Sequence, residues 1–238
     1  MLQNINQLHG AKLGARDGDI GHVKDFYFDD KTWAIRYLVI DTGSWLSGRE
    51  VLLSPHAFKA HPFAGGEGGV KSVQVDLTRK QIEDSPSIDS HRLVSRQYEI
   101  EYYRYYGWAG YWQESAMWGL GIPAAVLPVD PNARPHHGHN QRDDVHLRST
   151  KAVTGYHIEA KDGRIGTVSG FMVDGKSWTI RELVVETGHW YAGKTIFLLT
   201  ESVDRISYPD STVLVKLAKE DIMQTTKDNV AHAAAAHG

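Results

Sequence analysis

The chain of 238 residues contains no cysteine and no long apolar run. The absence of cysteine excludes a disulfide framework, a thiolate metal site and a cysteine nucleophile, and it fits a reducing compartment. No stretch approaches the ~20 apolar residues of a membrane-spanning helix. Residues 1–6 also lack the basic and then apolar pattern of a secretion signal. We therefore expect a cytoplasmic protein without a transmembrane segment, for which peripheral association with a membrane stays open.

An excess of basic charge is also lacking. The whole chain has 26 Lys and Arg residues against 29 Asp and Glu residues. Within residues 1–83 the two signs are balanced, and they are balanced again within residues 147–224. Because binding to nucleic acid normally requires a basic surplus that displaces counterions from phosphates, we expect no nucleic-acid partner.

The clearest positive feature is an internal duplication. Residues 17–53 align with residues 162–198 at a constant offset of 145 positions and without a gap, and about half of the aligned residues are identical. The shared residues include Asp-Gly, Ile-Gly, Trp, Ile-Arg, Thr-Gly and a second Trp, in that order. A long gapless internal match indicates a duplicated structural unit.

Each copy has the sequence pattern of short strands joined by tight turns. In the first copy a strand is expected over residues 20–28, then a hairpin connection, then a long strand from Trp33 to Asp41 that is dense in β-branched and aromatic residues. Further strands are expected over residues 50–53 and 70–77, followed by a short helical turn from Thr78. Several short strands with frequent glycine predict a small barrel or sandwich.

The segment between the copies differs from both. Residues 95–106 are expected to form a helix with Tyr at helical spacing, ended by Gly107. Tryptophans follow in a stretch rich in glycine, and residues 123–142 are rich in Pro, His and Asn and are expected to be a loop. We therefore predict four regions: a first repeat at 1–83, an aromatic, partly helical linker at 84–146, a second repeat at 147–224, and a frayed tail at 225–238.

The motif Asp-Gly-x-Ile-Gly-x-Val, followed by Trp-x-Ile-Arg-x-Leu-Val and by Thr-Gly-x-Trp, resembles the PRC-barrel family. That family includes the cytoplasmic domain of the photosynthetic reaction-centre H subunit and the C-terminal part of the ribosome maturation factor RimM. The resemblance implies a mainly β fold with two tandem small PRC-type β-barrels. For function it implies docking onto larger assemblies rather than catalysis, in a bacterial protein.

Several tryptophan and arginine residues are candidates for contact with a protein partner. Exposed loop tryptophans are typical anchors at interfaces, and a strand arginine can bind a carboxylate or a phosphate. The alternatives are that the loop tryptophans close a barrel end, and that the arginines either pair within a domain, with Asp41 or Glu50, or extend to the surface. For the linker tyrosines the alternative is a core between the barrels. The candidates are Arg36, Trp45, Trp108, Trp112, Trp118, Arg181 and Trp190.

Metal binding is a weaker interpretation of two clusters. His136, His137 and His139 are close in the sequence, but closed zinc sites need about four ligands, and a solvated loop is the simpler interpretation. Asp17, Asp19 and Asp25 could line a cation loop, yet the second copy lacks two of these carboxylates, and an Asp-Gly turn explains them better. We expect no metal and no other cofactor.

The sequence thus predicts a non-catalytic binding or scaffold protein, and not an enzyme. An assembly or stability factor for a larger protein complex is the first hypothesis, and self-association into a homo-oligomer is open because repeated faces can be self-complementary. A reaction-centre-associated protein at the cytoplasmic membrane face is an alternative. A protein that binds a small molecule or metal between the barrels is another, and it predicts a polar-lined cleft between the repeats.

Overall fold

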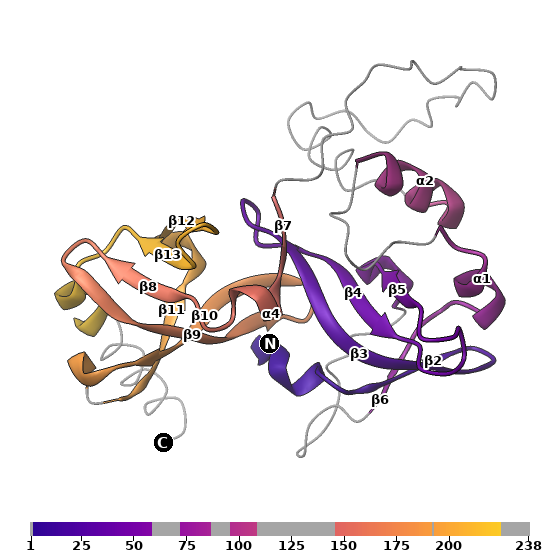
Figure 1. The fold of residues 1–238 in the computed structure, drawn as a ribbon, viewed down its shortest axis with the longest axis horizontal. Helices are drawn as coiled ribbons and strands as arrows, with labels where there is room; N and C mark the ends of the chain where they lie inside the picture. Colours follow the sequence, from indigo (N-terminus) through magenta and orange to yellow (C-terminus); the bar gives the residue numbers. More distant parts are fainter. Residues whose placement is uncertain (1, 59–71, 87–95, 109–145, 192, 225–238) are drawn as a thin grey trace. The chain divides into compact units, whose positions relative to one another are not determined.

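The computed structural model shows a mainly β protein with two sheets, one for each copy of the duplication (Figure 1). The chain divides into one compact unit that holds both copies, residues 1–79 and 146–238, and a second unit over residues 80–145. The residues that the structure describes are 2–58, 72–86, 96–108, 146–191 and 193–224.

The first sheet has the strand order β5-β4-β3-β2-β6. Neighbouring strands are antiparallel except for β2 and β6, which run parallel. Its core is formed by the apolar residues of β3 and β4, such as Phe26, Leu38 and Ile40, which are almost fully buried. The strand bounds are β2 Lys12–Ala15, β3 Gly18–Asp29, β4 Ile35–Asp41, β5 Glu50–Leu53 and β6 Ser72–Gln74.

The second sheet repeats this order as β11-β10-β9-β8-β13 and adds β12 beyond β13. The parallel pair recurs between β8 and β13. Among the described residues no hydrogen-bonded pairing joins the first and last strands of either sheet. The strand bounds are β8 His157–Ala160, β9 Gly163–Asp174, β10 Thr179–Thr187, β11 Thr195–Leu199, β12 Val203–Ser207 and β13 Thr212–Val215.

The Ile-Gly pair shared by the copies has a steric cause. A Cβ atom on Gly21 would lie 2.0 Å from the carbonyl oxygen of Asp41, and one on Gly166 would lie 2.2 Å from that of Glu186. Real side chains do not approach backbone this closely, so both long strands need glycine where they cross the end of the next strand.

Each sheet is completed by a strand that precedes the other copy. β7 (Leu147–Ser149) pairs with the end of β3, so that Leu147 lies opposite Asp29. β1 (Leu2–Asn4) pairs with the end of β9, so that Leu2 lies opposite Asp174. The two pairings have the same register after the offset of 145. The two copies thus exchange their leading strands. The sequence predicts two separate barrels in tandem, and this exchange is not part of that prediction.

A short helical turn follows each exchanged strand. The 3-10 helix η1 (Ile5–Leu8) follows β1 and is capped by Asn4, and the helix α4 (Thr150–Val153) follows β7 and is capped by Ser149. In both cases the cap side chain accepts a hydrogen bond from a backbone N–H of the first turn. The capping residue thus ends the exchanged strand and starts the turn that leads into the next strand, β2 or β8.

The second unit contains the helical part of the linker. The predicted helix over 95–106 is confirmed as α2 (Arg96–Tyr106) and ends at Gly107 with a φ of 70°. The Trp108 N–H donates to the Tyr103 carbonyl at 3.0 Å and the Gly107 N–H to that of Arg104 at 3.2 Å, which together form a Schellman cap. Before it lies the short α1 (Arg79–Glu83), and the Tyr105 hydroxyl donates to the Gln81 carbonyl.

None of the helices in the described ranges is both long enough and apolar enough to cross a bilayer.

Candidate functional site

The two copies meet at their β3-β4 and β9-β10 hairpins. The loop residues 30–33 and 175–178 are called here the Trp33 corner and the Trp178 corner. In each loop the aspartate before it, Asp29 or Asp174, accepts backbone N–H bonds from within the loop. The same aspartate's carbonyl accepts the N–H of the tryptophan at 2.8 Å. This local bonding is the Asp-initiated turn chemistry expected from the sequence.

Both tryptophans have a left-handed backbone conformation. The φ angle is 60° at Trp33 and 53° at Trp178, a region that bulky residues rarely occupy. The prediction that Trp33 starts the long strand is therefore wrong: β4 begins at Ile35, because Trp33 belongs to the turn. Such outliers persist only where surrounding structure holds them, and they point to sites worth inspecting.

Reciprocal hydrogen bonds hold the two corners together. The Ile35 N–H donates to the Trp178 carbonyl at 2.7 Å, and the Ile180 N–H donates to the Trp33 carbonyl at 2.8 Å. Each tryptophan carbonyl thus bonds the strand of the other copy. The Phe28 ring stacks on the Trp33 ring with centroids 5.5 Å apart and contacts the Phe171 ring at 5.7 Å.

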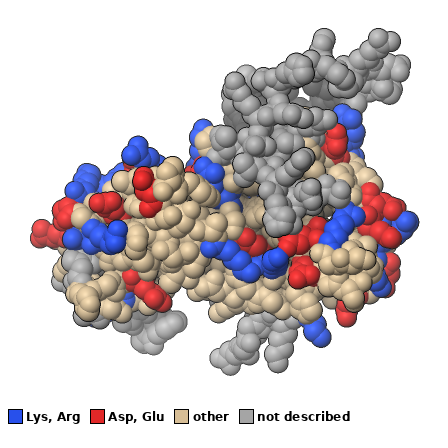
Figure 2. Space-filling view, viewed as in Figure 1, with Lys and Arg blue, Asp and Glu red and all other residues tan. Residues whose placement is uncertain are grey.

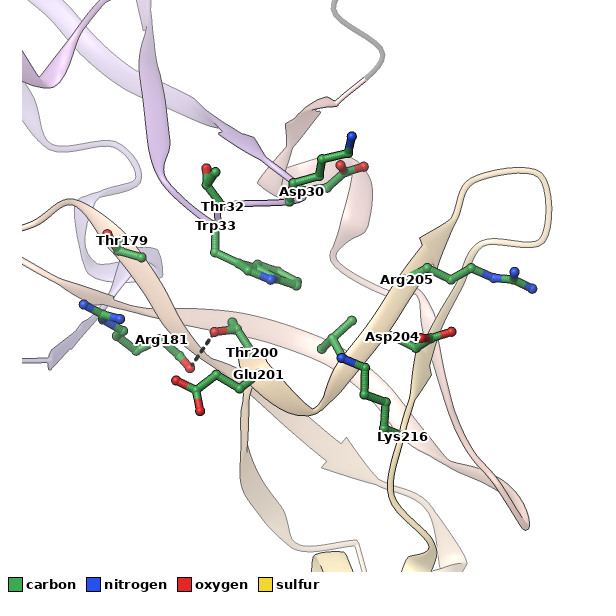
Figure 3. Close-up of a pocket in the computed structure, with 12 residues that line it drawn as sticks. Asp30, Thr32, Trp33, Thr179, Arg181, Thr200, Glu201, Asp204, Arg205 and Lys216 are labelled. Atoms are coloured by element: carbon green, nitrogen blue, oxygen red, sulfur yellow. Dashed lines mark hydrogen bonds between the residues drawn. The ribbon is translucent and has the colours of Figure 1, made fainter. Parts of the chain in front are cut away.

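A pocket of about 440 Å³ opens at the Trp33 corner, between the copies (Figure 3). In this view the Trp33 indole lies in the middle of the pocket. Lys216 reaches toward it from one side, Arg181 and Glu201 lie on the other, and Arg205 extends away. A polar-lined cleft between the repeats is the feature that the small-molecule or metal-binding hypothesis predicts. The lining residues are Asp30, Lys31, Thr32, Trp33, Thr179, Arg181, Thr200, Glu201, Val203, Asp204, Arg205 and Lys216.

One carboxylate of the pocket is already occupied. Asp30 accepts Arg148 Nε at 2.6 Å and lies 2.9 Å from His146 Nδ1. The Arg148 guanidinium also lies over the Tyr208 ring, 4.0 Å from its centroid. Burial raises the pKa of the Tyr208 hydroxyl to about 12, although nearby Arg148 opposes the shift, so the ring stays neutral at physiological pH. This cluster fixes one wall of the pocket.

The other charged groups have no such partners. Thr200 donates its hydroxyl to the Arg181 backbone carbonyl at 3.2 Å, and the Arg181 residue is exposed. Within the described part of the chain, six charged side chains of the lining make no ion pair with one another or with the rest. They are Lys31, Arg181, Glu201, Asp204, Arg205 and Lys216.

The Trp178 corner differs from the Trp33 corner in the side chain that packs against its indole. The Phe58 ring packs against Trp178 with centroids 5.2 Å apart. After the offset of 145, Phe58 corresponds to Val203, and it follows the 3-10 helix η2 (Pro55–Ala57) as Val203 follows η4 (Thr200–Ser202). Where Trp178 meets the Phe58 ring, the Trp33 corner therefore has the smaller Val203, and both Trp33 and Val203 line the pocket.

The paired arginines diverge in the same way. Arg36 is only 3% exposed and forms an ion pair with Asp29 at 3.3 Å. The predicted partners, Asp41 and Glu50, are wrong, because Asp29 lies beside Arg36 across the hairpin; Glu50 instead bonds Lys24. The prediction of an ion pair within the domain is thus confirmed with a different partner.

Of the remaining tryptophan candidates, the structure describes the side chains of Trp45 and Trp108. Trp45 is half-buried, and the Arg79 guanidinium lies 4.6 Å above its ring. Trp190 belongs to the 3-10 helix η3 (His189–Tyr191), and the structure does not describe its side chain. In the second unit, Trp108 stacks on Tyr106 at 4.5 Å. Trp112 and Trp118 lie outside the described residues.

The metal candidates do not yield a site in the described ranges. No cluster of three or more His, Asp or Glu side chains suited to a metal ion occurs there. His136, His137 and His139 lie outside the described residues. Asp25, one of the carboxylates of the cation-loop interpretation, instead accepts hydrogen bonds from Ser149, from the Thr150 hydroxyl at 2.9 Å and from the Lys151 N–H at 3.2 Å. It binds the exchanged strand.

Charges of both signs are interspersed over the described residues on the face shown in Figure 2. Sequence reasoning singled out Arg181 but missed Trp33, Lys216 and the residues of η4 and β12. The available signal for Trp33 was its repetition as Trp178 directly after an Asp-initiated turn.

Comparison with known proteins supports the fold. The model of the PRC-barrel domain family matches residues 7–82, which contain the first copy. The match does not extend to the second copy, which shares the strand order and register of the first. A protein of Deinococcus radiodurans, described as an uncharacterised protein, is 29% identical over 93 residues. That match spans 39% of this chain and 31% of the relative.

Proposed function

We propose that this protein is a non-catalytic binding protein that docks onto a larger protein complex as an assembly or stability factor. The Trp33 pocket carries the proposal, because it combines an aromatic ring with charged side chains that have no partner among the described residues. Aromatic and arginine side chains are enriched at binding surfaces, and polar groups around an apolar pocket fix the orientation of what binds.

The test is affinity capture from the native cells with the full chain as bait. Proteins retained by the wild-type chain should be lost from a Trp33→Ala/Lys216→Ala variant. They should be kept by a Lys176→Ala variant, which changes an exposed lysine of the Trp178 corner. Each protein that meets both criteria is then purified and titrated with the three chains. Equal retention by all three would contradict docking through this pocket.

Binding of a small molecule is a second candidate function, which the polar-lined pocket between the copies also supports. Native mass spectrometry of the protein purified from its own cells tests it. A mass increment that is present in the wild-type chain and absent from the Trp33→Ala/Lys216→Ala variant would favour this function. The reaction-centre role and the cytoplasmic location stay predictions from the resemblance and the sequence.

A further inference from the structure

The Trp33 pocket has the features of a site for an aromatic side chain of another polypeptide. We propose that it binds a peptide segment of a partner protein in which an aromatic residue is flanked by acidic residues. This inference rests on the proposed docking function and specifies its ligand.

The Trp178 corner shows how such a side chain can be held. There the chain itself supplies Phe58, whose ring meets Trp178 at 5.2 Å with a tilt of 36°. The Trp33 corner has the same backbone conformation, and one face of its indole stacks on Phe28, which leaves one face for a further ring. The corresponding side chain is the shorter Val203. An incoming aromatic ring can therefore take at Trp33 the role that Phe58 has at Trp178, a contact favoured by burial and by ring geometry.

The charges favour an acidic flank. Four cations of the lining have no ion pair among the described residues, against two carboxylates in the same condition. An acidic residue beside the aromatic ring would meet Lys216, whose side chain reaches toward Trp33, and a residue further along the peptide would meet Arg181, whose guanidinium points outward on the other side (Figure 3). Complementary charge at an interface mainly raises the association rate and the selectivity. The cations are Lys31, Arg181, Arg205 and Lys216, and the carboxylates are those of Glu201 and Asp204.

The extent of the hollow favours a peptide over a compact molecule. A second pocket of about 530 Å³ adjoins the first, because Asp204 and Lys216 line both. It runs along β13 and reaches Glu159 and Lys161 of the neighbouring segment. One aromatic side chain would occupy part of the space next to Trp33, and the rest of this pocket and the adjoining one offer room for the residues that flank it. Exposed aromatic anchors of this kind are typical of peptide recognition.

The probe is a synthetic peptide, acetyl-Asp-Glu-Phe-Glu-Asp-amide, titrated into the full chain. Binding is followed by the indole N–H signals in a proton–nitrogen NMR spectrum, and the Trp33 signal is assigned with a Trp33→Phe variant. We expect saturable shifts of the Trp33 signal. A peptide with Ala in place of Phe should bind about tenfold more weakly or worse, because it lacks the ring contact. Equal shifts with both peptides, or none at Trp33, would overturn the proposal.

A charge-reversal pair separates a specific flank from general attraction. The Arg181→Glu/Lys216→Glu variant should lose most of the affinity for the peptide. The control, Arg164→Glu/Lys176→Glu, makes the same change in net charge at exposed residues outside the lining and should keep it. Similar losses in the two variants would overturn the acidic flank. N-acetylphenylalanine is the small-molecule arm, and if it binds as tightly as the peptide the occupant is not a peptide.

A gain of binding provides a second, independent readout. Phe58→Ala removes the covering ring, so the peptide should then also shift the Trp178 signal. If the peptide does not bind but retention of captured proteins still depends on Trp33, the proposed peptide ligand is wrong and the docking function stands. Failure of both the peptide and the Trp33-dependent capture would overturn both.

Discussion

The Trp33 and Trp178 corners have the same backbone but different surroundings. In both, an aspartate organises the loop, the tryptophan has a positive φ, and its carbonyl bonds the other copy. Each indole has a ring neighbour from a different position: Phe28 stacks on Trp33, whereas Phe58 packs against Trp178. The junction therefore requires the backbone that the two corners share. The side chains beside each indole differ between the copies, as Phe58 and Val203 do.

The arginines three residues beyond each tryptophan show the same divergence. Arg36 is buried and neutralised by Asp29, whereas Arg181 is exposed at the pocket. Asp174, the counterpart of Asp29, bonds instead to its own loop through the Lys176 N–H and the Ser177 hydroxyl. One corner thus serves mainly stability, and the other keeps its charges available.

The largest expected effect is on the aromatic support of the Trp33 corner. Phe28→Ala should lower the free energy of unfolding by about 3–5 kcal/mol, because it empties a fully buried position that contacts both Trp33 and Phe171. The matched change in the other copy, Val173→Ala, removes fewer atoms and should cost less. Urea unfolding measures both variants. Equal costs would show that the two corners are supported alike.

The arginine pair provides the next test. Arg36→Met should cost about 3 kcal/mol, because it leaves the Asp29 carboxylate without its buried cation while two loop N–H groups remain bonded to it. Arg181→Met should change stability by less than about 0.5 kcal/mol, because its side chain is exposed. The measurement is again the free energy of unfolding, and a large cost at Arg181 would remove the contrast between the corners.

A smaller effect is expected when the covering ring is removed. Phe58→Ala should lower the free energy of unfolding by about 1 kcal/mol, because it deletes one partly buried ring contact. Val203→Phe is the reciprocal change, and it should place a ring over Trp33 and weaken binding at the pocket. Thermal unfolding and fluorescence of the indoles follow the two variants. A Val203→Phe variant that binds partners as the wild type does would show that the corners are not interchangeable.

The smallest expected effect depends on pH. His9 lies edge-on to Phe26 at 5.5 Å, and burial lowers its pKa from the usual 6.5. The neutral ring therefore contributes stability above pH 6.5 that is lost as the pH falls through the lowered pKa of the folded state. The second copy has Thr154 at this position. His9→Thr should reduce the loss of stability below pH 6.5 relative to the wild type, and an unchanged loss would exclude His9 as its source.

Much of the fold was predictable because it depends on local patterns. The strand expected over residues 50–53 is β5, and the helix expected over residues 95–106 is α2 with its glycine cap. β-branched residues, turn aspartates and cap glycines act within a few residues of themselves. The duplication then transfers each prediction to the other copy, and the bounds of β9 repeat those of β3 at the same offset.

The exchanged strands and the pocket could not be predicted in the same way. Residues 2–4 have no alternating pattern, and their pairing with β9 is a contact between distant parts of the chain. The pocket depends on the residue that follows η4, which is Val203, whereas Phe58 follows η2 at the other corner. The sequence does not show that these two positions are equivalent until the two corners have been superposed by the offset. Asp29 was missed as the partner of Arg36 because the hairpin register decides that contact.

The reciprocal pairing of β1 and β7 has a consequence for how the molecule can be divided. A fragment that ends before residue 147 would leave the last three residues of β3 with unbonded backbone groups at an apolar margin, and the opposite fragment would expose the end of β9. Each half, made alone, would offer its own leading strand to a second identical half. A symmetric dimer of single halves is therefore built into the same contacts, and the covalent chain replaces that bimolecular encounter with one at high effective concentration.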